Sequence, residues 1–213
     1  GPEVSYDARE VLNRLPEVTG VMRGEGEATF LELLQHYRRE GKELSEISGI
    51  AYRNDEGKIC ENEWRKPIDL SLIPFVYHDM EDFRNKIIYY ETSRGCPFSC
   101  SYCLSSVDKC LRFRDLDLVK KELQFFIEKK VQQVKFVDRT FNCHHEHAMA
   151  IWQFIKERDN GVTNFHFEIS ADLINEAELE LMSTMRPGLI QLEIGVQSTN
   201  EVTIQEIHRT MKL

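Results

Sequence analysis

Apolar residues in the second part of the chain follow two alternating periods. Short runs rich in branched and aromatic residues predict β-strands, and apolar residues spaced by three or four positions between them predict amphipathic helices. The predicted strands are residues 87–92, 133–138, 165–170 and 189–196, and the helices that follow them begin near residues 116, 148, 176 and 201. This alternation is typical of right-handed βαβ units with a parallel sheet. Units of about 35 residues suit an α/β fold of the (β/α) barrel type, or a part of such a barrel.

The first part of the chain has a different pattern. Residues 1–40 predict two helices around a loop, and the second helix has one apolar side. That side carries Phe30, Leu33, Leu34 and Tyr37. Residues 47–63 predict a β-hairpin, because two strand-like runs flank a cluster of turn-forming residues.

A less regular segment separates the two patterns. Residues 64–86 contain two prolines and few periodic runs, which predicts a linker. We therefore expect three parts: residues 1–63 with the hairpin, the linker 64–86, and a barrel portion at 87–213. The pattern at residues 210–213 predicts a chain that stops in the middle of a helix.

Composition and charge narrow the class of protein. The chain has 213 residues, of which 41% are hydrophobic, and a formal net charge of −9. An acidic chain of this kind is not typical of a general nucleic-acid binder. No apolar run approaches the ~20 residues of a membrane-spanning helix, and no signal segment opens the chain. We expect a soluble, cytoplasmic protein without a membrane or nucleic-acid partner.

The cysteines are unevenly placed. Three of the six lie within eight residues, in the spacing C-x3-C-x2-C formed by Cys96, Cys100 and Cys103. Without signs of secretion, such a group indicates metal binding or redox chemistry instead of a disulfide framework. Thiolates suit an iron–sulfur cluster or zinc, and the loop follows the first strand of the barrel series, on the expected catalytic face. Three thiolates on a four-iron cluster leave one iron open to a substrate.

The run from Arg94 to Cys103, with the aromatic Tyr102 just before the last cysteine, resembles the radical S-adenosylmethionine (radical SAM) superfamily. The resemblance extends from Ile87 to the end of the chain. It implies a [4Fe–4S] cluster held by the three cysteines, and an open iron that binds S-adenosylmethionine. An electron donor of the flavodoxin or ferredoxin type reduces the cluster in that family. Cleavage of the cofactor then gives a 5′-deoxyadenosyl radical, which takes a hydrogen atom from a small-molecule substrate that is unknown here. The resemblance also implies a truncated barrel.

The same resemblance and the strand ends give candidate contacts to S-adenosylmethionine. They are Tyr102, Asp138, Glu168, Ser170, Glu193, Gln197 and Ser198. Polar side chains in a parallel strand are costly unless they are paired or face a ligand. For Asp138, capping of the following segment is an equal alternative. Arg94 and Arg139 are candidates for a carboxylate of substrate or cofactor, although surface solvation is the alternative for each.

The front segment resembles the tail of a doubly wound cobalamin-binding domain, as found ahead of the barrel in one branch of the superfamily. The matching residues are Gly1 to Ser5, Gly20 to Glu27 and Leu70 to Tyr77. The histidine motif that ligates cobalt is absent, so we expect cobalamin in a full-length protein but not in this chain. A loose similarity to the anaerobic magnesium-protoporphyrin ester cyclase group says little about the substrate. Cobalamin-linked methyl transfer, oxidative cyclisation and methylthiolation are the candidate reactions. Methylthiolation is disfavoured, because the front segment has only Cys60.

The alternative from another class is a zinc-stabilised binding module without catalysis. Its fourth ligand would be Cys110, His144, His145 or His147. Structural zinc sites more often use paired C-x2-C elements, and only one such pair exists here. We interpret residues 144–147 as an exposed, polar helix start. The identity of the bound metal separates the two hypotheses.

Overall fold

The computed structural model describes residues 1–107 and 109–211, apart from the side chain of Asp82. The chain divides into two compact units, Gly1–Ile68 and Asp69–Leu213. The three-part division expected from the sequence remains a prediction. Among the described residues, no helix has the length and apolar character needed to cross a membrane.

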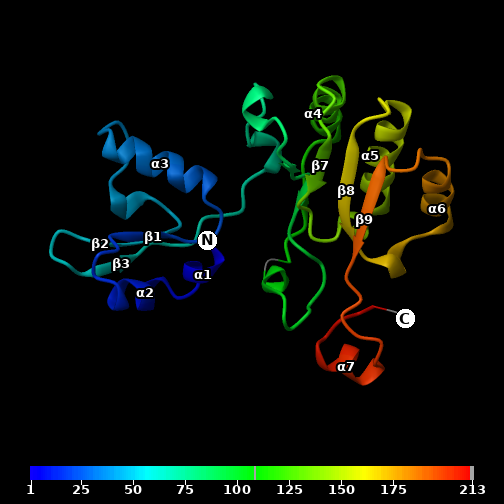
Figure 1. Ribbon diagram of the computed structural model, residues 1–213. Coiled ribbons are helices and arrows are strands. Elements are labelled where there is room, and N and C mark those ends of the chain that lie inside the picture. The colour runs from blue at the N-terminus through cyan, green and yellow to red at the C-terminus, as the bar shows by residue number, and fades with distance from the viewer. Residues whose placement is uncertain (108, 212–213) are drawn as a thin grey trace. The chain divides into compact units, whose positions relative to one another are not determined.

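The first unit is a small antiparallel sheet with short helices (Figure 1). Its strands are β1 (Gly20–Met22), β2 (Ile50–Arg53) and β3 (Ile59–Glu61), in the order β1-β2-β3. Its helices are α1 (Pro2–Ser5), α2 (Ala8–Arg14) and α3 (Glu27–Tyr37), with a 3-10 turn η1 at Leu44–Glu46. The predicted hairpin is confirmed, because β2 pairs with β3. The apolar side of α3 is largely exposed, and Phe30 and Tyr37 are 52% and 70% accessible.

The second unit contains a parallel sheet in the order β4-β7-β8-β9. The strands are β4 (Ile88–Tyr90), β7 (Gln133–Phe136), β8 (Asn164–Ile169) and β9 (Ile190–Ile194). The helices are α4 (Leu116–Glu128), α5 (His145–Glu157), α6 (Glu176–Ser183) and α7 (Glu201–Glu206). Each predicted strand is therefore present, each is followed by the predicted helix, and the neighbouring strands run parallel.

Shorter elements fill the loops of the second unit. A pair of two-residue strands, β5 (Ser93–Arg94) and β6 (Arg112–Phe113), brackets the cysteine loop. The 3-10 turns are η2 (Leu70–Leu72), η3 (Glu81–Phe83), η4 (Leu104–Ser106), η5 (Phe141–Cys143) and η6 (Ala171–Leu173).

The hydrophobic core of the second unit lies between the sheet and helices α4, α5 and α6 (Figure 1). Alternate residues of β8, namely Phe165, Phe167 and Ile169, are buried in it. Trp152 of α5 is fully buried against Phe167, and their ring centroids lie 6.0 Å apart. This period of two on the strands sends the intervening residues to the opposite face, which the helices leave open.

Several residues of the segment predicted as a linker pack in the second unit. Phe75, Tyr77, Met80 and Phe83 pack against the core of the second unit. The buried guanidinium of Arg114 also donates hydrogen bonds to the carbonyl oxygens of Leu70 and Ile73. Residues from 69 onward therefore belong to the second unit.

The end of the chain differs from its prediction. Helix α7 ends at Glu206, and His208 takes a left-handed backbone with φ of 52°. Thr210 and Met211 are not helical, so the prediction of a chain that stops in mid-helix is wrong for them. Lys212 and Leu213 lie outside the described residues. The turn at His208 brings the next residues back toward the cysteine loop.

Candidate functional site

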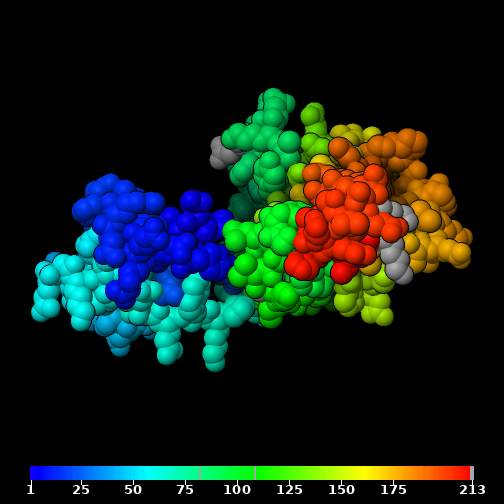
Figure 2. All heavy atoms as spheres, turned by 90° about the horizontal axis from the view of Figure 1, so that it is seen from below, coloured from blue at the N-terminus to red at the C-terminus, as the bar shows by residue number. Residues whose placement is uncertain are grey.

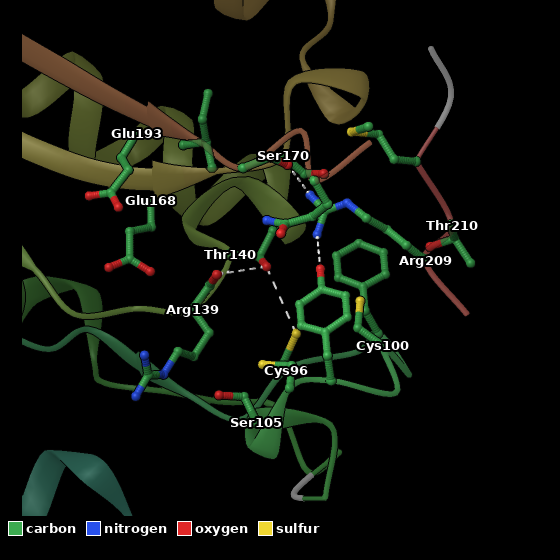
Figure 3. Close-up of a pocket in the computed structure, with 17 residues that line it drawn as sticks. Cys96, Cys100, Ser105, Arg139, Thr140, Glu168, Ser170, Glu193, Arg209 and Thr210 are labelled. Atoms are coloured by element: carbon green, nitrogen blue, oxygen red, sulfur yellow. Dashed lines mark hydrogen bonds between the residues drawn. The ribbon is translucent and has the colours of Figure 1, made fainter. Parts of the chain in front are cut away.

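A cavity of about 260 Å³ lies at the carboxyl ends of the parallel strands (Figure 3). Its wall includes all three cysteines of the C-x3-C-x2-C motif, together with residues that follow β7, β8 and β9. The contributing side chains are Cys96, Phe98, Cys100, Tyr102, Cys103, Ser105, Arg139, Thr140, Glu168, Ile169, Ser170, Glu193, Gln197, Arg209, Thr210 and Met211, with Gly195 between them. The barrel topology thus brings the cysteine loop together with polar groups that lie more than a hundred residues away in the sequence.

The cysteine loop is held at two points, before its first cysteine and between its last two. Gly95 has φ of +96°, and a Cβ atom there would lie 2.5 Å from the carbonyl oxygen of Cys110, so the close approach of these segments requires glycine. The amide of Ser101 donates a 2.9 Å hydrogen bond to the carbonyl oxygen of Ile207. In Figure 2 the C-terminal segment, in red, lies against the green loop. Both contacts hold the motif next to the carboxyl ends of the parallel strands.

The chemistry of the three thiols fits an iron–sulfur cluster. Cys96 and Cys100 are buried, Cys103 is half-buried, and none is in a disulfide. No three histidine, cysteine or acidic side chains in the described part of the chain converge closely enough to hold one metal ion. A cubane makes a different demand, because each thiolate binds a different iron. The donor set and the open space beside it fit that group.

Four of the predicted cofactor contacts meet in this cavity with Tyr102: Glu168, Ser170, Glu193 and Gln197. The structure does not bring Ser198 or Asp138 to its wall. Ser170 donates a 2.6 Å hydrogen bond to Asp172. Gln197 has a left-handed backbone with φ of 66°. A Cβ atom at Gly195 would lie 2.7 Å from the side-chain nitrogen Nε2 of Gln197.

Asp138 lies under the cysteine loop and is fully buried. Its carboxylate accepts hydrogen bonds from the Thr92 amide at 3.0 Å, the Thr92 hydroxyl at 2.6 Å and the Ser93 hydroxyl at 2.6 Å. Burial raises the pKa of Asp138 to about 6, although these hydrogen bonds oppose the change. Asp138 therefore ties the end of β7 to the residues that lead into the motif.

His147 is the buried partner of this group. Its Nε2 lies 3.1 Å from the hydroxyl of Thr92, and its ring lies 4.7 Å from that of Phe113 between centroids. Burial lowers the pKa of His147 to about 4. The expectation that residues 144–147 are all exposed is wrong for His147, because this aromatic packing encloses its ring. His144 caps α5 and His145 contacts Glu178 at 2.8 Å, so both are engaged in the fold.

The face of the sheet that the helices leave open carries a group of charged side chains next to the cavity. The ammonium of Lys135 lies 3.0 Å from Glu193 and 3.7 Å from Glu168, and Nε2 of His166 lies 3.1 Å from Glu193. The hydrogen bond from Lys135 lowers the pKa of Glu193, and the same bond raises the pKa of Lys135. Figure 3 shows the carboxylates of Glu168 and Glu193 on the same side of the cavity.

Several residues of the cavity wall were not predicted from the sequence, among them Arg209 and Thr140. Arg209 donates a 2.9 Å hydrogen bond to the Tyr102 hydroxyl and another to the carbonyl oxygen of Gly195. Its position depends on the turn after α7, which no local pattern revealed. Arg139 reaches the cavity wall, whereas Arg94 pairs with Glu91 at 2.6 Å and is not part of the wall.

Comparisons with known proteins identify the family of the chain. Residues 90–212 match the family model of the Radical SAM superfamily. An uncharacterized methyltransferase of Pyrococcus horikoshii is 32% identical over 74% of this chain and 36% of its own length. The anaerobic magnesium-protoporphyrin IX monomethyl ester cyclase of Synechocystis is 26% identical over 98% of this chain and 43% of its own length. The chain thus spans less than half of either relative.

Among solved structures, the cobalamin-dependent S-adenosylmethionine radical enzyme OxsB, with aqua-cobalamin and S-adenosylmethionine bound, superposes with a TM-score of 0.77. It is 19% identical and covers 98% of this chain and 32% of its own. The likeness covers both units of the chain and supports the predicted α/β fold with a partial barrel.

Proposed function

Because the chain belongs to the Radical SAM superfamily, we propose that Cys96, Cys100 and Cys103 hold a [4Fe–4S] cluster and that S-adenosylmethionine binds in the adjoining cavity. The observation that carries this proposal is the meeting of the three thiols with polar side chains from three other strand ends in one cavity. A cluster of this kind supplies one electron for the reductive cleavage of S-adenosylmethionine. A separate electron donor, of the flavodoxin or ferredoxin type, reduces it.

The protein groups in the cavity match the parts of S-adenosylmethionine. Arg209 and Arg139 offer guanidinium groups to its carboxylate, and Glu168 offers a carboxylate to its amino group. Tyr102, Ser170 and Gln197 supply an aromatic face and hydrogen-bonding groups for the remainder. Glu193 lines the same wall, although its pairing with Lys135 makes it a better candidate for the substrate side. We keep Asp138 and Ser198 outside this set.

The reaction on the substrate is a transfer or cyclisation at a C–H bond of a small molecule. The names of the relatives favour methyl transfer, with oxidative cyclisation as the other candidate. We propose that cobalamin takes part in the whole protein, because the structural likeness to OxsB extends through the front unit. Free thiols and an oxygen-labile cluster favour the cytoplasm as the compartment.

Anaerobic reconstitution with iron and sulfide tests the proposal. We expect about four irons per chain, and an electron paramagnetic resonance signal after reduction that changes when S-adenosylmethionine is added. Replacing Cys96, Cys100 and Cys103 by alanine should abolish both results. Replacing Cys60, Cys110 and Cys143 by alanine is the matched control and should preserve them. One tightly held zinc without iron uptake would instead support the binding module.

A further inference from the structure

A hydroxyl group lies against one of the three motif sulfurs. The Oγ1 atom of Thr140 is 3.8 Å from Sγ of Cys96, and both residues are buried (Figure 3). Contacts to sulfur are long because the sulfur atom is large, so this distance is within hydrogen-bonding range. Thr140 comes two residues after Asp138, on the segment that leaves β7. The contact therefore joins the end of the second parallel strand to the first cysteine.

The direction of this hydrogen bond depends on the state of the thiol. The Thr140 hydroxyl donates to the carbonyl oxygen of Arg139 at 2.9 Å, which leaves the Cys96 thiol as the donor to Thr140. A cysteine that binds iron has lost its proton, and its sulfur can then only accept. The hydroxyl hydrogen rotates without movement of heavier atoms. A hydrogen bond to an anionic acceptor is stronger than one to a neutral carbonyl, so the proton of Thr140 turns to the sulfur.

The surrounding structure fixes both partners of this contact. Asp138 binds Thr92 and Ser93, which lead directly into the cysteine loop, through three hydrogen bonds. The carbonyl oxygen of Thr140 accepts a 3.0 Å hydrogen bond from the amide of Cys143 in η5. A β-branched side chain is also stiff about χ1. The hydroxyl is therefore held beside the sulfur without the need for a ligand.

We propose that Thr140 is a positioning residue whose hydroxyl donates a hydrogen bond to the Cys96 sulfur and raises the reduction potential of the cluster. The inference rests on the proposed function, because it concerns a cluster bound to Cys96. A reduced cluster carries one more negative charge than the oxidised one. A donor beside a ligating sulfur stabilises the reduced state more, and such hydrogen bonds are among the factors that set cluster potentials.

The test is a redox titration of the reconstituted 213-residue chain, followed by electron paramagnetic resonance. Thr140→Val keeps the shape of the side chain and removes the proton, whereas Thr140→Ser keeps the hydroxyl. We expect the cluster of Thr140→Val to be about tenfold harder to reduce, which is a potential about 59 mV lower for a one-electron couple. Thr140→Ser should stay close to the wild type.

The matched control is Ser105→Ala, which removes a hydroxyl from the same cavity wall. An equal potential in the wild type and Thr140→Val would overturn the inference, as would an equal shift in Ser105→Ala, because general polarity would then explain it. Thr140→Ala repeats the test if the valine variant assembles no cluster. Absence of iron from the wild type would instead overturn the proposed function, and this inference with it.

Discussion

The two faces of the parallel sheet differ in almost every residue they present. On β8, Phe165 and Phe167 turn to the helices and are essentially inaccessible, whereas His166 and Glu168 turn to the open face. The same contrast holds across the register. Glu168 pairs with Glu193 on β9, next to the pair of Phe167 and Leu192. A parallel sheet covered on both faces usually has nearly continuous apolar strands, so the open face is a departure that needs an explanation.

The difference indicates that the two faces of the sheet have different roles. The covered face holds the aromatic core, and the open face leads from the charged group around Lys135 up to the cysteines. Because successive residues of a strand point to opposite faces, one element serves both purposes without conflict. Substitutions should therefore affect stability on one face and ligand chemistry on the other.

Trp152→Ala should cause the largest loss of stability, because it changes the covered face. Trp152 is fully buried between Phe141 and Phe167, so the truncation leaves a large cavity in the core. We expect the free energy of unfolding to fall by about 3–5 kcal/mol. Urea titration followed by circular dichroism measures the change.

Tyr89→Ala is the matched aromatic truncation on the open face, where Tyr89 is 55% exposed and opposite Lys135 in register. We expect a loss of less than about 1 kcal/mol, because little apolar area leaves the interior. Equal losses in the two variants would contradict the division between the faces.

The sequence predicts the covered face better than the open one. Residue period and branched side chains were enough to find the strands, and the spacing of Cys96, Cys100 and Cys103 was enough to find the loop. The sequence could not predict which way the side chain of Asp138 points, because its hydrogen-bond partners Thr92 and Ser93 lie 46 and 45 residues away. Arg209 reaches Tyr102 across 107 residues, after a turn with no local signal. Contacts of this kind depend on tertiary structure and not on periodicity.

Two buried titratable groups near the cysteine loop, Asp138 and His147, predict how the stability of the fold depends on pH. The pKa of Asp138 is raised from 3.8 to about 6, so the folded state keeps a proton that the unfolded chain has lost. Its contribution to stability therefore falls as pH rises through that range. The pKa of His147 is lowered from 6.5 to about 4, so the unfolded chain binds the extra proton and stability rises with pH. Each effect amounts to about 3 kcal/mol, and the two offset each other in the wild type.

Single substitutions should show the pH effects of Asp138 and His147 separately. In Asp138→Asn the free energy of unfolding should rise by about 3 kcal/mol between pH 4 and 6.5, because only the His147 effect remains. In His147→Gln it should fall by a similar amount over the same range. Urea titrations at pH 4, 5 and 6.5 measure both slopes. Two variants with the pH dependence of the wild type would show that these groups titrate normally in the fold.

Glu193→Gln should give the smallest effect on stability and the clearest effect on the charges of the open face. Glu193 is 53% exposed, and ion pairs at such positions contribute about 0–1 kcal/mol, so we expect a loss of less than about 1 kcal/mol in urea. The pKa of Lys135 should fall toward its ordinary value, because its hydrogen bond to Glu193 is the main cause of the raised pKa. Carbon-13 NMR of the lysine side chain measures that pKa. A loss of several kcal/mol would mean that the open face stabilises the fold as much as the covered face does. An unchanged pKa of Lys135 would mean that Glu168, and not Glu193, raises that pKa.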